Sequence, residues 1–184
     1  MSVILSILLA AQAAPAAPVP DDTQQESVDW DKEFAVPAKV RDPVTGELSV
    51  DSYELSNTNA GAAPFSGTGM AEAFGGQPGI RKIADRFVEL NISDPRIKAI
   101  FESHDMVRLR RTLFEQFCYI LNAGCSYTGR DMASSHKGLG ATRADLNALV
   151  ENLQKAMREN DIGFATQNRF LAKLAPMSGD VVER

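Results

Sequence analysis

Apolar residues recur at helical spacing throughout the part of the chain that follows residue 66. After "FGGQPG" (74–79), Ile80, Ile83, Phe87 and Leu90 stand three or four residues apart. That period places them on one face of a helix. Two further stripes of the same kind follow: Met106, Leu109, Leu113, Phe117 and Ile120; and Leu146, Leu149, Val150, Leu153 and Met157. A last helix is predicted to hold Phe164, Phe170, Leu171 and Leu174. Residues 67–177 are therefore predicted to form one all-α domain, and 178–184 a short C-terminal tail.

Helix starts and stops are marked between these stripes. Ser93-Asp94-Pro95 combines capping side chains with proline, so a short helix is expected to begin there. Thr142 with Asp145 three residues later predicts the start of a longer helix. Pro176 is expected to end the last one.

The first 66 residues have a different character. Residues 1–13 hold an apolar run followed by Ala11-Gln12-Ala13, a pattern typical of a secretory signal with cleavage after Ala13. The run is too short to anchor the chain in a bilayer of about 30 Å. Residues 14–66 are predicted as a polar, weakly ordered lead-in in which "DPVTGEL" (42–48) forms a turn. We expect export to the periplasm, with a cytoplasmic location if this segment is not a signal.

Charge and cysteine content narrow the class of protein. The formal net charge is −5 and no Lys/Arg cluster is present, which argues against nucleic acid or anionic membrane as a partner. Cys118 and Cys125 are the two cysteines. Asn122 and Gly124 between them can end a helix and fold the chain back, so a disulfide is possible, with two separate thiols as the alternative. Export favours the bridge.

The two histidines are the clearest candidates for chemistry. His136 follows the "YTGRDM" turn (127–132) at the end of a short helical segment, which Gly138 and Gly140 then break. A neutral imidazole there is a good iron ligand, although a lone histidine at a helix end is more often a surface residue. His104 stands among charged residues and is expected to be solvated.

Other chemistries lack their sequence patterns. A Cys-x-x-Cys-His motif for covalent haem is absent, and two histidines with two distant cysteines do not make a tetrahedral zinc site. A serine in a nucleophile-elbow context and a phosphate-cradling loop after a strand are also missing.

Four stretches resemble the group 1 truncated haemoglobins, in the order in which that family has them. They are "FGGQPGIRKIADRFVE" (74–89), "SDPRIKAIFESHDMVRLRRTLFEQF" (93–117), "YTGRDMASSHKGLGAT" (127–142) and "NRFLAKLAPM" (168–177). The resemblance covers residues 70–177, and "YTGRDM" with histidine four residues later is its most specific part. The paired cysteines resemble those of a subset of exported members.

This resemblance implies a two-over-two helical sandwich around non-covalent haem b. His136 matches the proximal histidine, the fifth ligand of the iron, and Phe101 matches the phenylalanine that packs on the porphyrin. Leu109 and Leu113 match positions on the distal helix, with Thr112 at the edge of that face. The candidates for pairing the haem propionates are Arg110, Arg111 and Lys137.

The chain departs from the family at two positions whose side chains hydrogen-bond the bound oxygen in many members. Many members place a tyrosine and a glutamine at the positions of Val88 and Leu113. An aliphatic pair cannot donate a hydrogen bond, so we predict oxygen affinity about ten- to hundredfold weaker than in a tyrosine-bearing relative, and easier loss of superoxide. Whether Gln116 reaches the distal site or points to solvent stays open.

The sequence thus predicts a haem b protein that binds a diatomic gas, oxygen or nitric oxide, in an apolar distal pocket. One alternative is a haem-dependent enzyme such as a nitric oxide dioxygenase, supplied by an unidentified reductase. Another is a haem-free helical interaction module on a globin scaffold. Gas binding without catalysis is the reading favoured over the enzyme.

Overall fold

The computed structural model describes residues 39–183. The predicted signal segment, residues 14–38 of the lead-in and the last residue lie outside the described range. Within it the protein is helical, with a single isolated antiparallel bridge between Arg41 and Leu48. The elements in chain order are η1 (Asn57–Ala60), α2 (Gly69–Ala73), α3 (Gly76–Ser93), α4 (Lys98–Phe101), α5 (Met106–Ile120), α6 (Met132–His136), α7 (Arg143–Glu159), α8 (Phe164–Leu174), η2 (Ala175–Met177) and α9 (Ser178–Val181).

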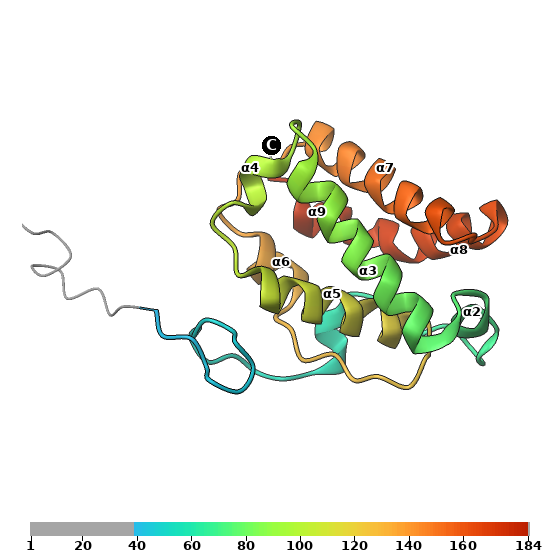
Figure 1. Cartoon of the computed structure of the whole chain (residues 1–184), viewed down its shortest axis with the longest axis horizontal. Coiled ribbons are helices and arrows are strands. Elements are labelled where there is room, and N and C mark those ends of the chain that lie inside the picture. The colour runs from blue at the N-terminus through green and yellow to red at the C-terminus, as the bar shows by residue number, and fades with distance from the viewer. Residues whose placement is uncertain (1–38, 184) are drawn as a thin grey trace, which may run out of the picture. The chain divides into compact units, whose positions relative to one another are not determined.

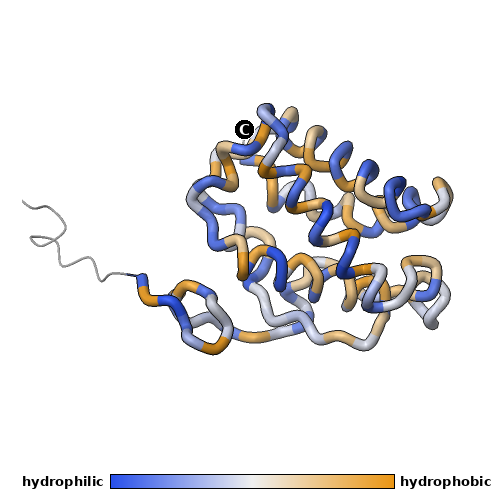
Figure 2. Tube along the Cα trace, viewed as in Figure 1, coloured by the Kyte–Doolittle hydropathy of each residue, from blue (hydrophilic) through white to orange (hydrophobic). Residues whose placement is uncertain are grey.

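Four longer helices make the two-over-two sandwich that the resemblance implied, so the all-α expectation is confirmed. Helix α3 packs against both α5 and α7, and α7 packs against α8 (Figure 1). The helices show hydrophobic and hydrophilic positions in alternation (Figure 2), as one-sided burial requires. No helix among residues 39–183 is long and apolar enough to cross a membrane.

The core lies between these helices and is centred on aromatic residues. Phe170 of α8 meets Phe74 and Phe117 edge to face, with ring centroids 5.2 and 5.1 Å apart. The predicted stripe of α3 is buried along its whole length. Burying side chains of this size stabilises a fold by about 1.5–3 kcal/mol each, so this cluster fixes how the helices pack.

One local expectation is wrong. Helix α4 begins at Lys98 and not at residues 93–95, because Ser93 still belongs to α3 and the Asp94 carboxylate caps a separate turn. That carboxylate accepts a hydrogen bond from the Arg96 amide at 3.0 Å. The last predicted helix is present as α8, whose first residue, Phe164, is 74% exposed.

The Thr142 prediction is confirmed. Its side chain accepts a hydrogen bond from the Asp145 amide, and the Asp145 carboxylate accepts one from the Thr142 amide at 2.8 Å. This capping box satisfies amides that a helix start would otherwise leave without partners. It fixes the residue at which α7 begins, directly after the segment that follows His136.

Residues 39–66, called here the N-terminal strap, contain little helix yet bond to the helical domain. The predicted turn at 42–48 is present, with Gly46 at φ +72. Further along, the Tyr53 hydroxyl donates to the Thr128 carbonyl at 2.8 Å, and the Phe65 amide donates to the Ile120 carbonyl at 2.8 Å. The strap therefore contacts both α5 and the connection between α5 and α6.

Candidate functional site

His136 ends the five-residue helix α6, as the sequence predicted. Asp131 caps the start of that helix by accepting a hydrogen bond from the Ser134 amide at 2.9 Å. After His136 the chain leaves the helix through Gly138 and Gly140, which have φ values of +80 and +64. Because residues with a Cβ are strained in this region, the two glycines allow the sharp exit.

The environment of the His136 ring selects one tautomer. Its Nδ1 lies 2.7 Å from the Met132 carbonyl oxygen, one turn back on α6. A carbonyl can only accept, so Nδ1 carries the proton and donates it to that bond. In the neutral ring, Nε2 then holds a lone pair. A histidine with this arrangement, half-buried at a helix end, is prepared to bind a metal through Nε2.

Several apolar positions of the predicted stripes are only half-buried. On α5 the C-terminal half of the stripe is buried, whereas its N-terminal half is not. The half-buried group comprises Ile100 and Phe101 of α4, Met106, Leu109 and Leu113 of α5, Leu139 after α6, and Leu146, Leu149 and Val150 of α7. An apolar group bound against these elements would remove their exposed hydrophobic surface from water. Their partial burial leaves apolar surface on α4, α5 and α7 that a bound apolar group could cover.

The predicted distal residues offer no side-chain donor that is free of another bond. Val88 is fully buried in α3, and Leu109 and Leu113 are half-buried on α5. The Thr112 hydroxyl is engaged with its own helix, donating to the Arg108 carbonyl at 3.0 Å. The residues that the sequence assigned to this face are therefore aliphatic or already bonded.

Gln116 takes neither of the orientations left open by the sequence. It is buried, and its Nε2 donates to the Ala60 carbonyl at 2.9 Å and to the Met132 sulfur at 3.2 Å. The amide thus connects α5 to η1 and α6. The Gln116 amide nitrogen is therefore already bonded within the protein and is not free to donate to solvent or to a distal ligand.

The three candidate propionate partners have different surroundings. Arg110 donates through Nη1 to the Asp85 carbonyl at 3.1 Å, and Lys137 is exposed just after His136. Arg111 is bonded to Glu47 and Thr128, and to Glu115 at 2.9 Å. Hydrogen bonding to Glu47 is the main cause that raises the pKa of Arg111. With two carboxylates beside it, Arg111 is poorly placed to pair a third anion.

Two features escaped the sequence analysis. The expectation that His104 is solvated is wrong for Nδ1, which is buried and lacks a hydrogen-bond partner among residues 39–183. Glu47 of the strap is buried and lies 3.1 Å from a guanidinium nitrogen of Arg108 as well as bonding Arg111. No sequence pattern marks a pair of residues so far apart in the chain.

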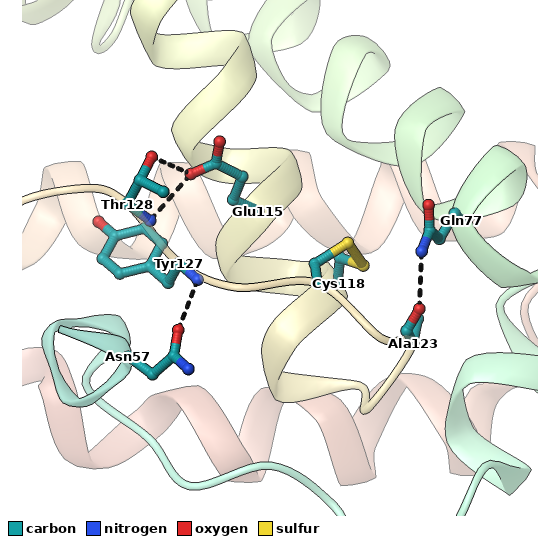
Figure 3. The surroundings of a disulfide bond; sticks show 8 residues. Asn57, Gln77, Glu115, Cys118, Ala123, Tyr127 and Thr128 are labelled. Carbon is teal, nitrogen blue, oxygen red and sulfur yellow. Dashed lines mark hydrogen bonds between the residues drawn. A yellow bond between two sulfur atoms is a disulfide. The ribbon is translucent and has the colours of Figure 1, made fainter. Parts of the chain in front are cut away.

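The two cysteines lie next to each other at the end of α5. The chain reverses after Ile120 through Asn122 and Gly124, whose φ values are +61 and +84, as expected from their types. This brings the Cα atoms of Cys118 and Cys125 to 5.6 Å, within the range for a disulfide (Figure 3). Beyond Cys125, the Thr128 amide donates to the Glu115 carboxylate at 3.0 Å, so the connection toward α6 is attached to α5.

Comparison by sequence finds one family across this region. A model of the bacterial-like globin family matches residues 70–183. The group 1 truncated haemoglobin of Tetrahymena thermophila is 26% identical over 88 residues, 48% of this chain and 73% of that protein. The group 1 truncated haemoglobin GlbN of Mycolicibacterium paratuberculosis is 23% identical over 110 residues, 60% and 81% of the two chains.

Comparison by structure agrees on the fold. The truncated haemoglobin of Tetrahymena pyriformis in its Fe(III) form superimposes with a TM-score of 0.60 at 22% identity, covering 62% of this chain and 98% of that one. The 2/2 haemoglobin of Synechococcus sp. PCC 7002, in the cyanomet state with covalently attached haem, gives 0.58 at 20% identity with the same coverage. The α3, α5, α7 and α8 arrangement is thus a known one.

Proposed function

We propose, from the premise that this chain belongs to the bacterial-like globin family and is a group 1 truncated haemoglobin, that His136 ligates the iron of haem b. The family assignment itself supports haem-based binding of a gas. The observation that carries the finer proposal is the 2.7 Å contact between His136 Nδ1 and the Met132 carbonyl, which leaves Nε2 as the metal-binding atom. Bound haem supplies an iron with one open position for a diatomic gas.

The half-buried apolar residues support the same proposal. Phe101 is proposed to pack on one porphyrin face, with Leu109 and Leu113 on the distal side and Leu139 near His136. Each is only partly covered in the protein alone, so contact with the ring would bury further apolar area. Arg110 and Lys137 stay as proposed partners of the propionates, whereas the contacts of Arg111 argue against it.

The distal side determines how the gas is held. Val88 and Leu113 carry no donor, and Thr112 donates to its own helix. We therefore propose that the protein binds oxygen or nitric oxide without a stabilising hydrogen bond, which suits reversible gas handling better than tight oxygen storage.

We also propose that the protein works in the periplasm. Support comes from the signal-like residues 1–13 and from the 5.6 Å separation of the Cys118 and Cys125 Cα atoms, since disulfides persist in oxidising compartments. Fractionation of cells expressing the full chain tests this. Protein of full mass confined to the cytoplasm would contradict it.

The ligand proposal is tested by reconstitution. Purified full chain is supplied with hemin, and spectra of the ferric, ferrous and carbon-monoxide forms are recorded. We expect a Soret band at one haem per chain. His136→Ala should abolish stoichiometric retention, and His104→Ala is the matched control because it removes the other histidine.

The results of this reconstitution distinguish ligation by His136 from the two alternatives, another iron ligand or a protein without haem. Stoichiometric haem in both variants would refute ligation by His136. A colourless wild-type protein after reconstitution would instead favour the haem-free interaction module.

A further inference from the structure

The C-terminal end of the chain returns to the backbone that follows His136. The Glu183 carboxylate accepts hydrogen bonds from two amides, Gly138 at 2.5 Å and Gly140 at 2.7 Å, one on each oxygen. The Glu183 amide donates to the Ala141 carbonyl at 2.9 Å. Three bonds thus join one residue near the C-terminus to three residues, Gly138, Gly140 and Ala141, of the exit from α6.

These amides need an external acceptor. Lys137 ends α6 with ψ +126, which turns the Gly138 amide away from the helical hydrogen-bond pattern, and both glycines then follow with positive φ. Helix α6 has only five residues, far below the length at which a helix is stable alone. The Leu139 amide lies between the two bonded amides and donates to the His136 carbonyl at 3.2 Å. Fixing residues 138 and 140 therefore also fixes a bond to His136 itself.

The carboxylate is delivered by a packed element and not by a free end. Residues 178–184, predicted as a tail, include α9 (Ser178–Val181), which packs against α6. The Val182 amide donates to the Ser178 carbonyl at 3.1 Å, so the helical path continues almost to Glu183. Just before α9, Met177 is buried and its sulfur lies 3.8 Å from Gln116 Nε2.

We propose that Glu183 is a positioning residue for the haem ligand. Its carboxylate holds the Gly138–Gly140 backbone, and through it the end of α6, so that the His136 ring keeps one direction. The inference rests on the proposed ligation by His136. Bonds from amides to an ionised carboxylate are stronger than those between neutral groups, so one side chain suffices for this task.

Three variants of the full chain test the proposal. Glu183→Ala removes both acceptors, and Glu183→Gln keeps one oxygen. Asp180→Asn removes the same charge three residues earlier, from an exposed side chain on α9. The first measurement is hydrogen exchange of the Gly138 and Gly140 amides in the purified chain. We expect about tenfold faster exchange in Glu183→Ala, a smaller change in Glu183→Gln and none in Asp180→Asn.

The second measurement is the iron–histidine stretching band of the ferrous haem-loaded protein. It should shift and broaden in Glu183→Ala, with Glu183→Gln between that variant and the wild type. Unchanged amide exchange in Glu183→Ala would overturn the proposal, and so would faster exchange with an unchanged band. Stoichiometric haem retention by His136→Ala would show instead that the ligand proposal had failed, and the positioning role would fail with it. The amide exchange would still report whether Glu183 holds the Gly138 and Gly140 amides.

Discussion

The two helices on either side of the proposed haem site are built in opposite ways. Helix α5, on the proposed distal side, has 15 residues and buries its C-terminal half in the core. Helix α6, which carries His136, has five residues, of which Met132 alone is buried. The long helix satisfies most of its own backbone groups, whereas the short one depends on Asp131, Met132 and Glu183 for its caps and for the direction of its histidine.

The difference also appears in what holds each helix from outside. Helix α5 is contacted by the N-terminal strap through charged side chains, above all Glu47 with Arg108 and Arg111. Helix α6 is contacted by the opposite end of the chain, α9 and Glu183. The strap thus contacts the longer helix through side-chain ion pairs, whereas α9 and Glu183 contact the shorter helix and the backbone that follows it.

The link between the two helices should give the largest effect on stability. Cys118 lies in α5 and Cys125 in the connection toward α6. With the bridge formed, replacing both by serine should lower the free energy of unfolding by about 2–3 kcal/mol, because a closed loop has less conformational entropy to lose. Urea unfolding measures the change.

Intact mass after alkylation without reductant provides the control for that experiment. The periplasmic wild-type protein should show no modified thiol. Two labelled cysteines, or a double variant as stable as the wild type, would contradict the bridge.

The strap contacts should come next. Glu47→Gln keeps the shape of the side chain but removes its charge beside two guanidinium groups, so we expect a loss of about 2 kcal/mol in unfolding free energy. Glu54→Gln, on an exposed residue of the same strap, is the matched control. The iron–histidine band should stay unchanged in both Glu47→Gln and Glu54→Gln, because the strap contacts α5 through Glu47 and does not hold α6 there.

The same contact predicts a pH dependence. Hydrogen bonding to Arg111, helped by the charges of Arg111 and Arg108, lowers the pKa of Glu47 below its ordinary value of 4.5. The folded state therefore favours the ionised form, and the stabilisation is complete above pH 4.5 and lost as the pH falls through the lowered pKa. The stability difference between wild type and Glu47→Gln should shrink below pH 4.5. A difference that stays constant into strong acid would exclude this contribution.

The smallest expected change concerns the distal face. Leu113→Gln would introduce a donor at the position where many relatives have glutamine. One hydrogen bond to a bound ligand with partial charge should raise oxygen affinity about tenfold, near 1.4 kcal/mol. Leu113→Met keeps the volume without a donor and serves as the control. Equal gains in both variants would mean that packing, and not hydrogen bonding, sets the affinity.

Much of the helical frame is predictable because its signals are local. Apolar spacing predicts α3, and Thr142 with Asp145 predicts the start of α7. The failure at residues 93–95 is also local in origin, because Asp94 can cap a turn as well as a helix.

The site is less predictable because its contacts join distant residues. Resemblance singled out His136, but nothing in the sequence indicates that Glu47 lies against Arg111 or that Glu183 bonds Gly138, 45 residues earlier. Gln116 illustrates the same limit: its position on α5 was clear, while its partner Ala60 belongs to a segment with no recognisable period. Such pairings follow from tertiary packing and from no local pattern.

Low-frequency resonance Raman spectroscopy of the ferrous protein tests the central claim most directly. The wild type should show an iron–histidine band that is absent in His136→Gly and returns when free imidazole fills the space left by the side chain. Persistence of the original band in His136→Gly without imidazole would show that another group ligates the iron.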